Sequence, residues 1–219
     1  MVKSNVGYAG SNKHKIALLL MAAGSSSRLG QPKQLVEITQ AENSTDSLLH
    51  RQVTLMANIC SFVNAKAYCV IGFESETMNE HLASCVAAQH LTLIDNESWS
   101  QGLSTSIAKG VSSLSSDVSA VLVFLVDQWK LSSKNVTRLI TQWQKQPEYI
   151  HIASDGNNFG PPVIFPRRFF TELMALSGDD GAKKIIKENS KQVKSIEMPA
   201  AFVDLDTPEQ LNTLKNNTN

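Results

Sequence analysis

Short runs of apolar residues alternate along this chain with segments in which apolar residues recur every three or four positions. The runs are typical of buried strands, and the three-to-four spacing is typical of amphipathic helices. The most apolar run, Ala120 to Val126 (AVLVFLV), is expected at the centre of a sheet. Because strands and helices alternate throughout, we predict an α/β fold: a three-layer α/β/α sandwich with a Rossmann-like, mostly parallel sheet.

The remaining expected elements continue this alternation. Further strands are predicted at Ile16 to Leu20, Ala67 to Ile71, Leu91 to Ile94, Val193 to Glu197 and Phe202 to Leu205. Helices are predicted over Leu48 to Ile59, Glu74 to Ala88, Thr105 to Leu114, Val136 to Trp143, Arg168 to Leu176 and Ala182 to Glu188, with a closing helix after Pro208. The polar segment Asn43 to Asp46 can cap the first helix. His151 to Phe165 contains Gly156, Gly160, Pro161 and Pro162, which predicts a strand, a turn and a strand.

Length and composition indicate one domain. The chain has 219 residues, of which 42% are hydrophobic, and this is enough for one full-sized core. We expect a single domain spanning residues 1–219, with a core at about 14–214 and polar, frayed ends at 1–13 and 215–219.

Charge and hydropathy exclude several classes of protein. Lysine and arginine total 20, and aspartate and glutamate also total 20, so no global field favours nucleic acid or an anionic membrane. No apolar run approaches a membrane span, and residues 1–15 lack the apolar core of a signal peptide. We therefore expect a cytoplasmic protein that binds neither nucleic acid nor membrane. Cys60, Cys69 and Cys85 are expected to be reduced structural thiols.

The segment from Ile16 to Lys33 (IALLLMAAGSSSRLGQPK) carries the strongest chemical signal. Its strand leads into a small-residue loop whose backbone N–H groups and hydroxyls can cradle phosphates, while an arginine and a lysine add two cations. The loop lacks the spacing of both the dinucleotide fingerprint and the Walker loop. The alternative is a tight turn with incidental cations. We expect a nucleoside triphosphate to be bound by Ala22, Ala23, Gly24, Ser25, Ser27, Arg28 and Lys33.

Two carboxylates are candidate metal ligands. Asp127 directly follows the central predicted strand, at the carboxyl end where ligands bind in open α/β sheets. Asp204 and Asp206 would share one face of a late strand, and Asp206 is better placed at the strand end. We predict that Asp127 and Asp206 hold Mg²⁺ together with substrate phosphates. N-capping of a following helix is the alternative role for each.

The loop pattern A-A-G-x-S-x-R-x-G-x-P-K closely resembles the signature of the MobA-like nucleotidyltransferases. That family includes the molybdenum cofactor guanylyl- and cytidylyltransferases and related sugar and isoprenoid nucleotidyltransferases. Further ordered matches are Trp99 to Ser106, Asp127-Gln128-Trp129, Gly160 to Val163, Gly178 to Lys183 and Val203 to Glu209. The resemblance covers most of the chain. It implies a fold of the nucleotide-diphospho-sugar transferase type and a magnesium-dependent nucleotidyltransferase.

Within this family the chain is most similar to the molybdenum cofactor cytidylyltransferase branch. This resemblance implies CTP as the nucleotide, molybdenum-molybdopterin as the acceptor, and Gly102, Ser104 and Ser106 at the nucleobase. For either serine, capping of the next helix is an alternative. The chain departs from the family in one step, because Trp129 replaces a proline and would add a large ring beside the proposed metal.

The reaction implied is attack by an acceptor phosphate oxygen on the α-phosphorus of the triphosphate, with pyrophosphate leaving. The acceptor is already ionised near neutral pH, so alignment and charge neutralisation can suffice. We expect Arg28 to hold the β- and γ-phosphates, Lys33 to neutralise charge at the α-phosphate, and Asp127 to place the metal with Asp206. The alternatives are a guanylyltransferase that uses GTP, a different phosphate-bearing acceptor, and a non-catalytic nucleotide- or cofactor-binding accessory protein. A molybdoenzyme or accessory protein is the expected macromolecular partner.

Overall fold

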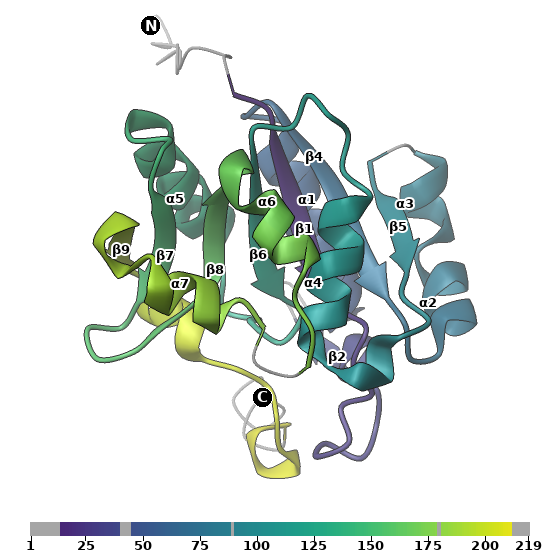
Figure 1. Cartoon of the computed structure of the whole chain (residues 1–219). Helices are drawn as coiled ribbons and strands as arrows, with labels where there is room; N and C mark the ends of the chain where they lie inside the picture. The colour runs from purple at the N-terminus through teal and green to yellow at the C-terminus, as the bar shows by residue number, and fades with distance from the viewer. Residues whose placement is uncertain (1–13, 40–44, 89, 179–180, 212–219) are drawn as a thin grey trace, which may run out of the picture.

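The computed structural model describes residues 14–39, 45–88, 90–178 and 181–211, and its main feature is a seven-stranded sheet (Figure 1). Its strands are β1 (Ile16–Met21), β4 (Ala65–Ile71), β5 (Thr92–Asp95), β6 (Ala120–Leu125), β7 (Ile150–Ser154), β8 (Phe159–Pro166) and β9 (Val193–Glu197). They lie in the order β5-β4-β1-β6-β8-β7-β9. All neighbouring pairs are parallel except those of β8, which is antiparallel to both β6 and β7. The sheet is therefore mostly parallel, as predicted.

Helices cover both faces of this sheet (Figure 1). One face carries α1 (Leu48–Cys60), α2 (Ser75–His81), α3 (Ala83–Ala87) and α5 (Ser133–Lys145), and the other carries α4 (Leu103–Ser112), α6 (Phe170–Met174) and α7 (Lys183–Glu188). Successive side chains of a strand point to opposite faces, so the strands supply two apolar clusters. In β1, Leu18 and Leu20 belong to one cluster, whereas Ala17 and Leu19 belong to the other. The predicted three-layer α/β/α sandwich is confirmed.

A small hairpin before α1 was not predicted from the sequence. It consists of β2 (Glu37–Thr39) and β3 (Thr45–Ser47), which are too short and polar to give a periodic signal. Ser47 caps α1, because its hydroxyl accepts a hydrogen bond from the backbone N–H of His50 at 3.0 Å. The cap thus follows the predicted capping segment, whose residues 43 and 44 lie outside the described ranges.

Two predicted elements are wrong. The helix expected over Glu74 to Ala88 is divided into α2 and α3 at Leu82, whose side chain is fully buried. The strand expected at Phe202 to Leu205 is replaced by a 3₁₀ helix over Pro199–Phe202 and irregular chain after it. The carbonyl of Ala201, directly before the expected strand, accepts a hydrogen bond from the side chain of Gln128. A final helical turn begins at Pro208, as predicted.

Other expectations from the sequence concern the thiols and the chain ends. All three cysteines are free, and burial raises the pKa of Cys60 to about 11 and that of Cys69 to about 12. Such thiols are poor nucleophiles, in keeping with a structural role.

The segments predicted to be frayed lie outside the described ranges. Within those ranges, the helices are too short or too polar for any of them to cross a membrane.

Gly110 allows α4 to pack closely on the sheet. A Cβ atom at this position would lie 2.7 Å from Cδ2 of Leu19 and 3.1 Å from Cγ2 of Val70, and both side chains are fully buried. We expect Gly110→Ala to lower the free energy of unfolding by about 1–2 kcal/mol, because overpacking outweighs the gain in helix propensity. Urea denaturation followed by circular dichroism measures this difference. The control Lys109→Ala, on the exposed face of α4, should change it by less than about 0.5 kcal/mol, and equal values for both variants would contradict the packing argument.

Candidate active site

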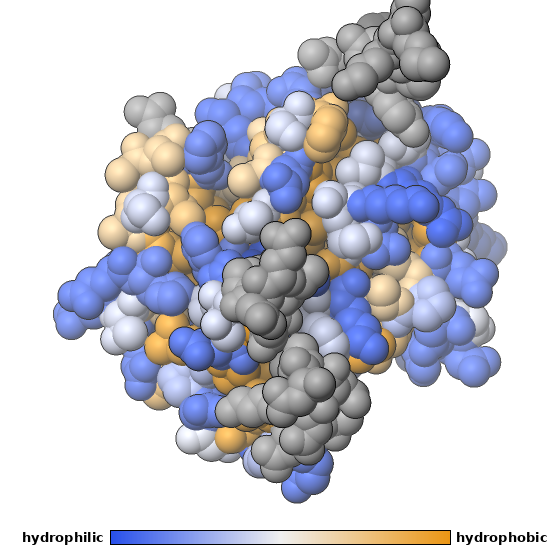
Figure 2. Space-filling view, turned by 180° about the vertical axis from the view of Figure 1, so that it is seen from behind, coloured by the Kyte–Doolittle hydropathy of each residue, from blue (hydrophilic) through white to orange (hydrophobic). Residues whose placement is uncertain are grey.

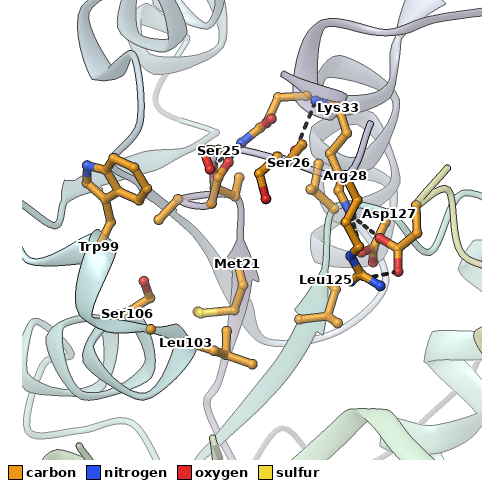
Figure 3. Close-up of a pocket in the computed structure, with 18 of the residues that line it drawn as sticks. Met21, Ser25, Ser26, Arg28, Lys33, Trp99, Leu103, Ser106, Leu125 and Asp127 are labelled. Carbon is orange, nitrogen blue, oxygen red and sulfur yellow. Dashed lines mark hydrogen bonds and ion pairs between the residues drawn. The ribbon is translucent and has the colours of Figure 1, made fainter. Parts of the chain in front are cut away.

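A cavity of about 470 Å³ lies at the carboxyl ends of β1 and β6 (Figure 3). These strands are parallel neighbours, so the segments that follow them meet at one edge of the sheet. The loop after β1 forms one wall, and in Figure 3 Trp99 and Asp127 lie on opposite sides of the opening. The cavity is lined by Met21 to Arg28, Lys33, Gln34, Trp99, Ser100, Gly102, Leu103, Ser106, Leu125, Val126, Asp127 and Asp206.

The loop after β1 is held in place by hydrogen bonds to its backbone. The side chain of Gln34 is almost fully buried, and its Nε2 donates to the carbonyl oxygens of Ala22 at 2.7 Å and Gly24 at 2.8 Å. Ser26 adopts a positive φ of 56°, and its Oγ accepts a hydrogen bond from the backbone N–H of Lys33 at 3.1 Å. A non-glycine residue in this left-handed region is uncommon and marks a constrained turn. The constraint presents the serines and Arg28 toward the cavity.

A chain of ion pairs closes one end of the cavity. The ammonium of Lys33 lies 2.7 Å from Oδ2 of Asp127 and 2.6 Å from Oδ1 of Asp206. The guanidinium of Arg28 lies 3.3 Å from the other oxygen of Asp206 and is largely exposed. Residues from the β1 loop, the end of β6 and the C-terminal segment are therefore joined by one charge network (Figure 3).

This network fixes the protonation of its members. Burial alone would lower the pKa of Lys33, but the charges of Asp127 and Asp206 and hydrogen bonds to them raise it above 10.5. Burial would raise the pKa of Asp206, yet its hydrogen bond to Lys33 and the charges of Lys33 and Arg28 lower it below 3.8. For Asp204, burial and then the charges of Asp127 and Asp206 raise the pKa to about 6. At neutral pH, Lys33 is a cation and Asp206 an anion.

The carboxylates fit a divalent cation. Oδ1 of Asp127 is buried and, among the described residues, accepts no hydrogen bond, so it presents an unused anionic oxygen. Carboxylate oxygens are the ligands that Mg²⁺ and Mn²⁺ take in nucleotide enzymes, usually one or two together with substrate phosphates. In the part of the chain that the structure describes, no group of three or more His, Cys, Asp or Glu residues is arranged to hold a metal alone. The site therefore suits a cation that arrives with phosphate oxygens.

The far wall of the cavity is built around Trp99. Its indole packs on Gly72, where an added Cβ would lie 2.6 Å from the Cβ of Trp99. The ring of Phe73 meets the indole edge-on, with 5.4 Å between ring centroids. This wall offers a flat apolar face of the kind on which a nucleobase can stack.

Asn96 joins this wall to α4. Its buried side-chain amide donates to Oγ1 of Thr105 and to Oγ of Ser106, both at 3.0 Å, and its Oδ1 accepts from the backbone N–H of Ser98 at 3.2 Å. Gly102 between them has a φ of 106°, a value that glycine adopts readily. The amide thus fixes the turn that carries Trp99 and orients the Ser106 hydroxyl at the cavity.

The structure brings together most of the residues that the sequence singled out. The cavity is lined by Ala22, Ala23, Gly24, Ser25, Ser27, Arg28, Lys33, Gly102, Ser106, Asp127 and Asp206. Ser104 does not line it: the side chain is fully buried, and its Oγ accepts a hydrogen bond from the backbone N–H of Gly181 at 3.0 Å. This hydrogen bond links α4 to the turn before α7, which indicates a structural role for Ser104. Residues 179 and 180 of that turn lie outside the described ranges.

Trp129 does not lie where the sequence argument expected it. Its ring packs against the buried cluster that includes α1 and α5, and the residue is not part of the cavity lining. The backbone N–H of Trp129 donates to the carbonyl of Asp127 at 2.8 Å, and its carbonyl accepts from Nε of Arg51 at 3.0 Å. The large ring therefore packs outside the cavity lining, and the expectation of a large ring beside the metal candidates is wrong.

Gln128 holds the backbone around Asp127. Its side chain is almost fully buried, its Oε1 accepts from the N–H of Leu125, and its Nε2 donates to the carbonyls of Pro161 and Ala201, both at 2.7 Å. We expect Gln128→Leu to lower the free energy of unfolding by about 2–4 kcal/mol, because it removes the partner of one buried and two partly buried backbone groups. Chemical denaturation measures the loss. A decrease below about 0.5 kcal/mol, the level expected for the exposed variant Lys130→Leu, would show that these bonds contribute little.

Several residues of the site were missed by reasoning from the sequence. Gln34 and Asn96 act through hydrogen bonds to backbone or to other side chains, and polar residues near a loop carry no signal for such partners. Trp99 was placed in a motif but not assigned to the cavity. The strand-end argument selects Asp206 and not Asp204, although the charges of Asp127, Asp206 and Lys33 also act on the pKa of Asp204.

Comparisons with known proteins show which family model and which relatives this sequence matches. The sequence matches the MobA-like NTP transferase domain over residues 18–193. Purine catabolism protein PucB of Bacillus subtilis (strain 168) is 26% identical over 119 residues, and the match spans 52% of this chain and 57% of PucB.

Solved structures share the fold. Rv0371c from Mycobacterium tuberculosis H37Rv has a TM-score of 0.69 at 21% identity, covering 93% of this chain and 99% of its own, and a structure of Rv0371c with manganese scores 0.65. Molybdopterin-guanine dinucleotide biosynthesis protein A from Archaeoglobus fulgidus has a TM-score of 0.63 at 14% identity, covering 92% of this chain and 98% of its own.

Proposed function

Because the chain belongs to the MobA-like NTP transferase family and is a nucleotidyltransferase of that family, we propose that it transfers CMP from CTP to molybdenum-molybdopterin. Pyrophosphate is the second product, and Mg²⁺ is the metal. The observation that carries the proposal is the position of Lys33, whose ammonium lies between Asp127 and Asp206 at the end of the phosphate-binding loop.

The triphosphate is proposed to lie along the loop after β1. Gly24, Ser25 and Ser27 offer backbone N–H groups and hydroxyls, and Arg28 is exposed enough to reach the β- and γ-phosphates. Lys33 remains charged at neutral pH and neutralises the charge that grows around the α-phosphate. Asp127 and Asp206 would hold Mg²⁺, which supplies further charge neutralisation when bound. The manganese in the Rv0371c structure is consistent with a divalent cation.

The nucleobase is proposed to lie between Trp99 and the start of α4. Stacking on the indole and hydrogen bonds to Ser106 and to the backbone near Gly102 favour a planar base but do not distinguish cytosine from guanine. CTP is proposed from the resemblance of the segment Trp99 to Ser106 to the cytidylyltransferase branch. GTP is the second candidate, and the Archaeoglobus neighbour that is named for molybdopterin-guanine dinucleotide biosynthesis is in keeping with it.

The acceptor is proposed to be a pterin that carries a phosphate. The ordered matches at Gly160 to Val163 and Gly178 to Lys183 support this acceptor, as they are typical of the molybdenum cofactor branch. Trp129, the residue that departs from the family pattern, gives no support to a non-catalytic accessory role, because its ring packs outside the cavity. The charge network of Arg28, Lys33, Asp127 and Asp206 therefore favours a catalytic role over an accessory one.

A thermal-shift panel tests the choice of nucleotide. Wild type and Asp127→Ala are heated with CTP, GTP, UTP or ATP, with and without Mg²⁺. A ligand that binds the native state at 100 times its Kd stabilises it by about 2.7 kcal/mol, so we expect a rise in Tm with CTP that requires both Mg²⁺ and Asp127. The control Asp95→Ala removes an exposed carboxylate at the end of β5 and should retain the shift. A preference for GTP would favour the guanylyl alternative, and no shift with any triphosphate would contradict the proposal.

A further inference from the structure

A second cavity, of about 440 Å³, lies between α5 and the edge strand β9. It shares no residue with the candidate active site. Figure 1 shows α5 beside β7 and β9, at the opposite edge of the sheet from β5. None of the family motifs supplies its lining, which consists of Arg138, Gln142, Lys145, Gln146, His151, Lys194, Ser195, Ile196 and Glu197.

Three cations face this cavity against one carboxylate. Arg138 and Lys145 come from α5 and Lys194 comes from β9, whereas Glu197 is the one acid among the described residues of the lining. Within the described ranges, none of the three cations forms an ion pair. Figure 2, which views the face of α1 and α5, shows mostly hydrophilic side chains along the margin where α5 lies. The excess positive charge is available to an anion.

Two of these cations are held in place by neutral partners. Nη1 of Arg138 donates to the backbone carbonyl of Glu197 at 3.3 Å, so the guanidinium spans from α5 to β9. The ammonium of Lys194 lies 4.6 Å from the centroid of the Tyr149 ring. Both side chains are therefore positioned at the cavity without neutralisation of their charge. Positioned cations lose less conformational entropy when they bind an anion.

The cavity also contains a buried hydrogen-bond acceptor. His151 is only 2% exposed, and its Nδ1 donates to the carbonyl of Tyr149 at 3.2 Å, so Nδ1 carries the ring proton. Burial lowers the pKa of His151 below 6.5 despite this hydrogen bond and the charge of Glu148, and the charge of Lys194 lowers it further. The ring is neutral above pH 7, and Nε2 can accept a hydrogen bond. No described residue donates one to it.

From these contacts we propose that the second cavity binds hydrogen phosphate, a small oxyanion that carries both charged oxygens and a hydroxyl. Arg138, Lys145 and Lys194 contact the charged oxygens, and the P–OH group donates to Nε2 of His151. Sulfate has the same shape and charge but no hydroxyl, so it leaves the buried acceptor without a partner. The inference is independent of the nucleotidyltransferase activity.

Residue-resolved NMR tests this site separately from the loop at Lys33. The ¹⁵N-labelled protein is titrated with sodium phosphate or sodium sulfate at pH 7.5 and constant ionic strength, and the backbone amides of Lys194 and Ser195 are followed. We expect saturable shifts with phosphate and about tenfold weaker binding of sulfate. Lys194→Gln and Arg138→Gln should each weaken phosphate binding by about tenfold, since each removes a charge-assisted contact.

Two further variants make the test specific. His151→Phe should abolish the preference for phosphate over sulfate, because the acceptor is lost while the ring is retained. Lys184→Gln removes an exposed cation on α7, outside this cavity, and should bind phosphate as wild type does. The absence of saturable shifts in wild type would overturn the proposal. Equal affinities for phosphate and sulfate in wild type, or unchanged binding in Lys194→Gln and Arg138→Gln, would overturn it as well.

Discussion

Lys33→Ala is expected to lower kcat for pyrophosphate release by about 10²–10³-fold while the Kd for CTP changes by only a few-fold. Among the described residues, the ammonium of Lys33 is the one group that contacts both metal candidates, at 2.7 Å from Asp127 and 2.6 Å from Asp206. It is fully charged at neutral pH and can neutralise charge as the α-phosphorus reacts. Steady-state kinetics gives kcat, and isothermal titration calorimetry gives the Kd for CTP.

The control for this variant is Lys130→Ala. Lys130 is an exposed cation whose ammonium lies 5.1 Å from the centroid of the Trp129 ring, and it does not line the cavity. Its loss should leave both quantities close to wild type. Comparable losses of turnover and of affinity in Lys33→Ala would mean that Lys33 binds the ground state and the transition state equally, which contradicts the role assigned to it.

Asp127→Asn is expected to lower kcat/KM by about 10³-fold and to remove the response to Mg²⁺. The substitution keeps the shape of the side chain but removes the negative charge and one of two oxygen ligands. Oδ1 of Asp127 is buried without a hydrogen-bond donor among the described residues, so its replacement is not expected to break an existing bond there. Pyrophosphate release measured over a range of Mg²⁺ concentrations tests this, with the exposed Asp95→Asn as control. Recovery of full activity at high Mg²⁺ would contradict this prediction, because Asp127 would then contribute little to catalysis.

The variants Asp206→Asn and Asp204→Asn should lose different amounts of activity in the same assay. Asp206 is ionised at neutral pH, so Asp206→Asn should resemble Asp127→Asn. The pKa of Asp204 is raised to about 6, and near pH 6 an asparagine imitates the protonated half of its population. The ratio of wild-type to Asp204→Asn activity should therefore be lower at pH 6 than at pH 8, by up to about twofold. Equal losses for Asp204→Asn and Asp206→Asn at pH 6 would contradict the choice of Asp206 as the second ligand.

Much of the fold could be predicted because its strands are local and strongly apolar. Ala120 to Val126 and Ile16 to Leu20 are buried on both faces, and the sequence displays this as uninterrupted hydrophobic runs. The end of each strand then places the next residues at one edge of the sheet. For this reason the loop with Arg28 and the carboxylate of Asp127 could be predicted to meet before any contact was known.

The remaining features depend on partners distant in the sequence. No local pattern indicates that the carbonyl of Ala201 accepts a hydrogen bond from the side chain of Gln128, or that a 3₁₀ helix forms over Pro199–Phe202. The burial of Ser104 depends on the turn at Gly181, and the direction of the Trp129 ring depends on packing with the α1 and α5 face. Such tertiary contacts override local propensity.

The measurement that tests the central claim most directly is transfer of the α-phosphate label of CTP to molybdenum-molybdopterin, with pyrophosphate release recorded in the same reaction. The account predicts Mg²⁺-dependent labelling of the pterin, one pyrophosphate per label, with CTP preferred over GTP, UTP and ATP. Asp127→Asn should abolish both signals. Binding of CTP without metal-dependent labelling or pyrophosphate release would contradict the account and favour a non-catalytic accessory protein.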